Sequence, residues 1–197
     1  MRAICVDNGR LPERSRPEDW VFADYWTRYY TRREPEHAWV AARDGAVAGY
    51  LTAAFDTARH GREMRSRILP GILVRMSLRG TIMHAPSRLF LLKRWATWSS
   101  PDPEPAGLLE NYPAHLHVNL REGARNGGLG AALVDGCLAE AKRANVPGIH
   151  LKTLYENAGA CRFFERMGFA LVGKQFPFAR IDPALKDRAV VVYGRRL

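Results

Sequence analysis

A glycine-rich segment, Arg125-Asn126-Gly127-Gly128-Leu129-Gly130, stands just before an amphipathic stretch and has the composition of an anion-binding loop. The first N–H groups of a helix have no intrahelical partner and carry partial positive charge, and glycines let an anion approach the backbone. Arg125 adds a full charge. The chain lacks the Lys of the G-x-x-x-x-G-K-[ST] loop, and Leu133 stands where the dinucleotide fingerprint needs a third glycine. We therefore expect another anion here, with a purely structural turn as the alternative.

Two histidines, His115 and His117, alternate along the apolar stretch 115–120, so both side chains point to one face of the expected strand. Imidazole titrates near neutral pH and suits a general base that takes a proton from an ammonium group. The alternative is a pair of buried, hydrogen-bonded structural histidines. His150 and Lys152 share a face of a later strand and are expected to be solvated or paired. The three cysteines form no C-x-x-C pair and the histidines lack ligand spacing, so no metal site is predicted.

The elements that position these groups follow from hydrophobic periodicity and turn residues. We expect helices over 17–30, 129–144 and 158–167, hairpin strands over 39–42 and 47–55, and further strands over 115–120, 149–154, 169–174 and 189–193. A hairpin followed by alternating strands and helices predicts the α/β class, with residues 1–197 forming a single domain.

Two motifs of the chain resemble those of the GCN5-related N-acetyltransferases, the GNAT family. Arg125-x-x-Gly128-x-Gly130 is similar to the family's [QR]-x-x-G-x-[GA], and Asn157–Phe169 is similar to N-x-x-A-x-x-F-Y-x-x-x-G-F. The resemblance covers 39–55 and 112–175 and implies a GNAT-type domain with a mixed, mostly antiparallel sheet flanked by helices. The hairpin corresponds to the family's second and third strands. The stretch Tyr112–His117 also resembles acetyltransferase-like domains associated with O-GlcNAc hydrolases.

This resemblance implies acetyl-coenzyme A (acetyl-CoA) as the cofactor and direct transfer of its acetyl group to a primary amine. It implies that the pyrophosphate is held by the backbone of the glycine loop: Arg125, Asn126, Gly127, Gly128, Leu129, Gly130 and Ala131. It also implies that the pantetheine arm lies against residues of both motifs: Val118, Asn119, Leu120, Asn157, Ala160 and Phe163. A backbone N–H near 118–120 would stabilise the developing oxyanion. His117 and His115 then lie beside the expected reaction centre as candidate bases.

One position departs from the family pattern. Phe164 stands where the family has a tyrosine that acts as general acid, and a phenyl ring has no proton to donate. Tyr155 is close in the sequence and is the candidate replacement. A thiol with an ordinary pKa of about 8.5 also leaves readily as thiolate. The alternative function is a catalytically degenerate, coenzyme A-binding regulatory domain.

The charge of the chain is concentrated in one segment. The 197 residues carry a net charge of +10, and 57–95 holds nine basic residues against Glu63, a net +8. With 47% hydrophobic and 25% charged residues the chain is not disordered. No apolar run approaches the roughly 20 residues of a membrane-spanning helix. The early charges of the N-terminus do not suit a signal peptide, so we expect a cytoplasmic protein with reduced cysteines.

The basic segment lies in an insertion over about 56–111, between the third and fourth strands in the family's count. Its apolar spacing predicts amphipathic helices, broken at Pro70, Gly71, Gly80 and Pro86. We expect the insertion to cover the acceptor side, where its charge favours an amine that carries carboxylate or phosphate. The acceptor is a small-molecule or protein amine. Nucleic-acid or anionic-surface binding is the less favoured alternative, and edge strands allow a homodimer.

Overall fold

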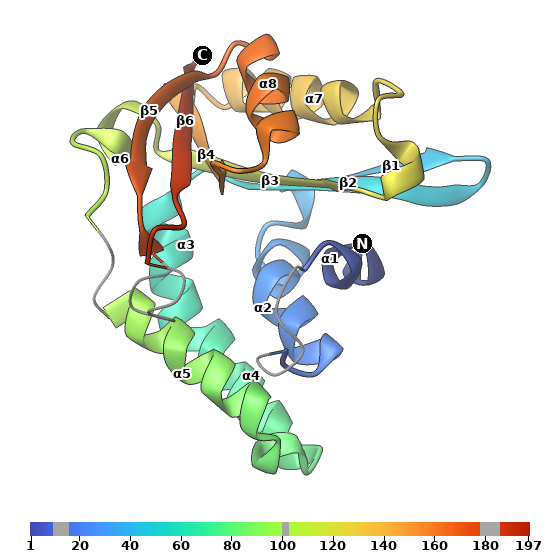
Figure 1. Ribbon diagram of the computed structural model, residues 1–197, viewed down its shortest axis with the longest axis vertical. Helices are drawn as coiled ribbons and strands as arrows, with labels where there is room; N and C mark the ends of the chain where they lie inside the picture. Colours follow the sequence, from blue (N-terminus) through green and yellow to red (C-terminus); the bar gives the residue numbers. More distant parts are fainter. Residues whose placement is uncertain (10–15, 100–102, 178–185) are drawn as a thin grey trace.

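A six-stranded sheet organises the protein (Figure 1). The computed structural model describes residues 1–9, 16–99, 103–177 and 186–197. The strands lie in the order β1 (Ala38–Arg43), β2 (Ala46–Ala54), β3 (Ala114–Leu120), β4 (Gly148–Leu154), β6 (Val190–Arg196) and β5 (Ala170–Gln175). Every neighbouring pair is antiparallel except β3 and β4. The predicted α/β class and mixed, mostly antiparallel sheet are therefore confirmed.

The β1–β2 hairpin forms where the Asp-Gly dipeptide predicts a turn. Asp44 and Gly45 adopt φ values of 52° and 72°, the left-handed conformations that a tight two-residue hairpin turn requires. Residues 48–54 of β2 are all buried. This strand carries an almost continuous apolar run because helices cover the sheet on both faces.

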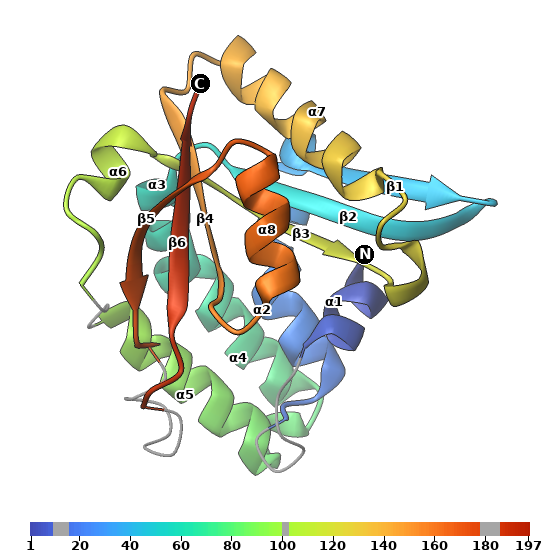
Figure 2. The same ribbon diagram turned by 45° about the horizontal axis from the view of Figure 1, so that its top comes forward.

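One face of the sheet is covered by α7 (Leu129–Arg143) and α8 (Ala158–Arg166), as Figure 2 shows. The buried side of α7 repeats at helical spacing through Leu133, Val134, Cys137, Leu138 and Ala141. These residues join Leu51, Leu116, Ile149, Leu151, Phe164, Phe169, Val191 and Tyr193 in the main core. Both helices begin and end within one residue of the predicted bounds.

The other face carries the N-terminal helices and the insertion (Figure 1). The predicted helix over 17–30 is α2 (Asp19–Arg32). A preceding helix, α1 (Arg2–Asn8), was not predicted from the sequence. The described residues before the hairpin are helical, and the insertion lies between β2 and β3.

Helices fill the insertion. They are α3 (Thr57–Glu63), a π-helical segment (Met64–Ile68), α4 (Leu69–Leu78), α5 (Ala85–Ser99) and the short α6 (Leu108–Asn111). The predicted break at Pro70 and Gly71 is wrong, since helical turns continue from Thr57 to Leu78. Pro70 stands in the first turn of α4, where its missing N–H costs least. Gly80 does end α4, with φ of 68°.

A second hydrophobic core joins the insertion to α2. Its buried members come from α2, β2 and the insertion: Val21, Tyr25, Tyr29, Tyr30, Ala54, Met64, Ile68, Leu69, Ile72, Met76, Phe90 and Leu91. The fully buried carboxylate of Asp24 on α2 accepts hydrogen bonds from Arg2, Arg28 and Arg75. One α2 residue thereby connects α1, α2 and α4. The insertion is therefore part of the folded body of the protein.

Within the described residues, every helix is too short or too polar to cross a bilayer.

The second core predicts a stability difference along α4. Ile72 is fully buried, whereas Leu78 on the same helix is 82% exposed. We expect Ile72→Ala to lower the free energy of unfolding by about 2–5 kcal/mol, and Leu78→Ala to change it by less than about 0.5 kcal/mol. Urea unfolding followed by circular dichroism measures both values. Equal, small effects would show that the insertion does not share a cooperative core with α2.

Candidate functional site

The two central strands separate soon after they pair. β3 and β4 are in register only at Ala114 with Ile149 and at His115 with His150. Beyond these pairs, β3 stays paired with β2 through Leu120, and β4 stays paired with β6 through Leu154. The sheet therefore opens between β3 and β4 while each strand keeps its outer partner.

The register determines which backbone groups of β3 face this opening. Hydrogen-bonded and non-hydrogen-bonded pairs alternate along an antiparallel ladder. The N–H of Arg121 donates to the carbonyl of Ala48 at 2.8 Å, and Gly49 stands opposite Leu120. Leu120 and Val118 are thus in the non-hydrogen-bonded pairs. Their N–H groups and the carbonyl of Val118 point away from β2, into the opening, where an extended ligand can pair with them. The carbonyl of Leu120 accepts a hydrogen bond from the side chain of Asn8.

The glycine loop leads from this edge into α7. Asn126 and Gly128 adopt left-handed conformations, with φ of 64° and 76°. Gly128 is the N-cap of α7 and no side chain caps the helix, so its first N–H groups remain available to an anion. A Cβ on Gly130 would lie 3.3 Å from Leu120 Cδ1 and 3.4 Å from Phe163 Cζ. Glycine at this position lets α7 approach β3 and α8.

Two arginines stand at the loop. Arg125 donates to Asn8 Oδ1 at 3.0 Å, and Asn8 Nδ2 donates to the carbonyl of Leu120 at 3.3 Å. The guanidinium of Arg43, from the end of β1, lies directly over Gly127. Arg43 was missed from the sequence because it is far from the loop along the chain. The one feature of the sequence that could have indicated it is its position at the end of β1, immediately before the Asp44-Gly45 turn.

The second motif lies against the first. Asn157 Oδ1 accepts from the N–H of Ala160 at 3.2 Å and so caps α8. Ala160 and Phe163 are partly buried against the main core. Since Phe163 also contacts Gly130, the structure brings the Asn157 motif and the glycine loop together beside the opening.

His115 is held at both ring nitrogens. The hydroxyl of Tyr30 lies 2.8 Å from Nε2, and the hydroxyl of Thr57 lies 2.8 Å from Nδ1. Burial, with the nearby His60, His117, His150 and Lys152, holds the pKa of His115 well below its ordinary value. Both ring nitrogens of His115 are therefore engaged within the protein, as expected of a buried structural histidine.

His117 differs from His115 in this respect. Its ring is half-buried and packs edge-on against Trp26 at 5.8 Å and Tyr30 at 6.1 Å between ring centroids. Burial, reinforced by His150 and Lys152, lowers its pKa to about 4. Within the part of the chain that the structure describes, it forms no hydrogen bond. Its ring nitrogens are therefore available to another molecule.

Two further histidines complete this cluster. The His60 ring, from α3, lies 4.7 Å from that of His115, and burial lowers its pKa to about 3. His150 donates from Nδ1 to the carbonyl of Tyr112 at 2.8 Å. No set of three or more His, Cys, Asp or Glu side chains in residues 1–9, 16–99, 103–177 and 186–197 is arranged to hold a metal ion.

Tyr155 is the candidate general acid, and Phe164 stands where the family has its tyrosine. Tyr155 is 58% exposed and packs under Lys174 Nζ, 4.1 Å above its ring. It follows the last residue of β4, five positions after His150 in the sequence. Phe164 is buried in the main core, 5.8 Å from the ring of Phe169. Phe164 carries no hydroxyl group, and the ring of Tyr155 packs with Lys174.

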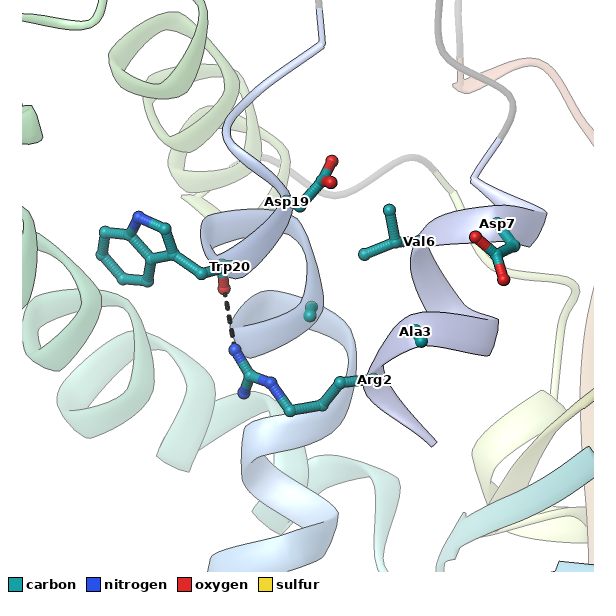
Figure 3. Close-up of a pocket in the computed structure, with 7 residues that line it drawn as sticks. Arg2, Ala3, Val6, Asp7, Asp19 and Trp20 are labelled. Carbon is teal, nitrogen blue, oxygen red and sulfur yellow. Dashed lines mark hydrogen bonds between the residues drawn. The ribbon is translucent and has the colours of Figure 1, made fainter. Parts of the chain in front are cut away.

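A cavity between α1 and α2 is separate from this region. It is lined by Arg2, Ala3, Val6, Asp7, Asp19, Trp20 and Ala23 (Figure 3). Arg2 donates across it to the carbonyl of Trp20 at 3.3 Å. None of the predicted site residues lines this cavity.

Comparison with known proteins agrees with the motifs. Residues 97–169 match the model of the acetyltransferase (GNAT) family. The crystal structure of SsHAT covers 99% of this chain and 91% of its own, with 24% identity and a TM-score of 0.68. Ard1 from Thermoplasma volcanium covers 84% and 74%, with 16% identity and a TM-score of 0.51. These structures show the fold. The predicted GNAT resemblance is confirmed, and an association with O-GlcNAc hydrolases is not shown.

The histidine cluster predicts sensitivity to acid. The folded-state pKa values of His117 and His60 lie below the ordinary 6.5. The unfolded chain therefore binds more protons as the pH falls below about 6.5, and stability is lost down to about pH 4. The free energy of unfolding should fall by about 1.4 kcal/mol per pH unit for each such histidine.

Urea titrations at pH 7.5, 6 and 5 measure this slope. His60→Phe, which keeps an aromatic ring beside Tyr30, should give a shallower slope than the unchanged protein. Leu78→Ala, an exposed apolar change on α4, is the control and should leave the slope unchanged. Parallel slopes for all three proteins would contradict the assignment.

Proposed function

We propose that this protein is an acetyl-CoA-dependent N-acetyltransferase, because residues 97–169 match the GNAT family model and the chain has the GNAT fold. It transfers the acetyl group to a primary amine by direct attack. The acceptor is a small-molecule or protein amine, and the whole chain acts as one domain. A cytoplasmic location and a homodimer are part of the same proposal.

The observation that carries this proposal is the opening between β3 and β4 beside an uncapped helix. The backbone of Val118 and Leu120 faces the opening and suits the amide groups of a pantetheine arm. The free N–H groups at the start of α7 suit the pyrophosphate. Arg43 and Arg125 add charge at the same loop. These residues fit acetyl-CoA, which supplies an acetyl thioester when bound.

The chain's own groups have separable roles in transfer. The neutral ring of His117 accepts a proton from the amine, because its nitrogens are not bonded within the protein. A backbone N–H of Val118 or Leu120 donates to the oxygen on which negative charge develops. Holding the amine against the opening supplies the remaining acceleration. Phe164 supplies no acid, so the departing thiol leaves as a thiolate.

The assay for this function detects both products. A thiol reagent reports free coenzyme A, and mass spectrometry reports an acetylated amine from a broad amine panel. Calorimetry with coenzyme A measures cofactor binding independently. Tight binding with no transfer to any amine would contradict the enzymatic role.

A second candidate function is a coenzyme A-binding regulatory domain without catalysis. The buried Phe164 and the weakly basic His117 favour it. Nucleic-acid binding through 57–95 is favoured less, because several arginines there are engaged internally. Arg75 pairs with Asp24, Arg67 pairs with Glu63, and Arg79 lies over Trp20.

The position of Arg43 at Gly127 allows a test of cofactor binding at the glycine loop. We expect Arg43→Gln to weaken acetyl-CoA binding about tenfold, because a charged hydrogen bond to phosphate contributes about 1.5–3 kcal/mol. The loss should shrink as salt rises. Calorimetry at two salt concentrations measures both effects. Arg67→Gln, the same change at an exposed ion pair on the insertion, is the control; equal losses in the two variants would refute a local role for Arg43.

The variant Phe164→Tyr tests whether a hydroxyl group at this position can act as the general acid. The new hydroxyl would enter the main core beside Phe169, and burying it without a partner costs about 1–3 kcal/mol. We expect lower stability and no increase in kcat. Thermal unfolding and the rate of thiol release measure the two outcomes. A tenfold gain in kcat would instead show that the hydroxyl reaches the departing thiol.

A further inference from the structure

Unsatisfied polar atoms gather at one place in the protein. Within the described chain, two buried side-chain polar atoms have no hydrogen-bond partner: Trp26 Nε1 and Thr52 Oγ1. Both belong to neighbours of His117. Thr52 stands directly opposite His117 in the β2–β3 register, and the Trp26 ring packs edge-on against it at 5.8 Å.

Their coincidence with His117 calls for a physical explanation. Buried polar groups are nearly always bonded, since an unmet donor or acceptor is costly. The neighbouring His115 follows this rule, with hydroxyl groups at both nitrogens. His117, Thr52 and Trp26 together retain two ring nitrogens, one hydroxyl and one indole N–H for another molecule. Thr52 is 1% exposed, whereas His117 and Trp26 are half-buried, so Thr52 forms the floor of the set.

A cation from the insertion stands at the same indole. Arg94 of α5 lies over Trp26, with its Cζ 5.8 Å from the ring centroid, and over Tyr25 and Phe90 at 5.7 Å and 5.3 Å. Among the described residues Arg94 forms no ion pair. A guanidinium held by aromatic rings retains its N–H donors for an anionic group.

We propose that Trp26, Thr52 and Arg94, with His117, form the acceptor subsite and select an amine that also carries a carboxylate. This proposal rests on the N-acetyltransferase function proposed above. His117 and Thr52 accept hydrogen bonds from the amine, which loses its proton to His117. Trp26 Nε1 and Arg94 donate to the carboxylate. Plain alkyl polyamines are disfavoured, because they place a second cation near Arg94.

Matched substrates test this selection. Leucine and phenylalanine are compared with leucinamide and phenylalaninamide, with kcat/KM referred to the free-amine concentration at each pH. We expect the carboxylates to be preferred about tenfold or more. Arg94→Gln should reduce that preference to less than about twofold. Arg88→Gln, the same change at an exposed residue of α5, should retain it. Equal use of the two forms, or equal effects of the two variants, would overturn the proposal.

The variant Thr52→Val tests whether the hydroxyl group of Thr52 binds the acceptor amine. Removing an unmet buried hydroxyl should raise the Tm of the free protein by a few degrees in either case. If the hydroxyl binds the amine, KM for leucine must also rise severalfold. A raised Tm with unchanged KM would refute the role of Thr52 in the subsite.

Measuring acceptor binding in the absence of acetyl transfer tests the subsite separately from the proposed acetyltransferase function. Leucine and leucinamide are titrated into the protein saturated with coenzyme A, and the shift in Tm is recorded. Preferential stabilisation by leucine, lost in Arg94→Gln, supports the subsite even if no acetyl transfer occurs. Stabilisation by neither compound, in a protein that does acetylate other amines, overturns the subsite and leaves the acetyltransferase function standing.

Discussion

The separation of β3 from β4 is the constraint on which the rest of the structure depends. A sheet that loses pairing at its centre needs support elsewhere, and here each central strand keeps an antiparallel partner on its outer side. On one face, Leu116, Leu151 and Phe164 join a single core that holds the diverging strands to α7 and α8. The unpaired edge of β3 is thereby made rigid, as an edge must be if it is to align an extended ligand.

On the opposite face of the sheet, the neighbouring helices and strands give His115 and His117 of β3 different hydrogen bonding. His115 lies where α2 and α3 both supply hydroxyls, from Tyr30 and Thr57, so its ring is fixed and neutral. His117 is one strand repeat further on and faces Trp26 and Thr52, which make no hydrogen bond to it. Because burial lowers the pKa of both rings, the difference between the two histidines lies in their hydrogen bonds.

The sequence predicted most of the fold, including the loop before α7 and the start of α8, which carry the two motifs. The Asp44-Gly45 turn and the Asn157 cap depend on local conformation, which local residues determine. The positions of Arg43 at Gly127 and of Thr52 opposite His117 could not be predicted, since they depend on the register of β1, β2 and β3. Proximity in the sequence favours Tyr155 as the general acid. An extended strand separates such neighbours, and the structure places Tyr155 beside Lys174.

The basic insertion illustrates how net charge differs from available charge. A fully buried Asp24 requires cationic partners, and Arg75 meets that need together with Arg2 and Arg28. Arg67 and Arg33 similarly share Glu63. Arginines that form such ion pairs contribute little to the charge available to a ligand, so the available positive charge of the insertion is smaller than its net charge indicates. Arg94 stands out because aromatic rings hold it without neutralising it, and it is the insertion's cation at Trp26, beside His117.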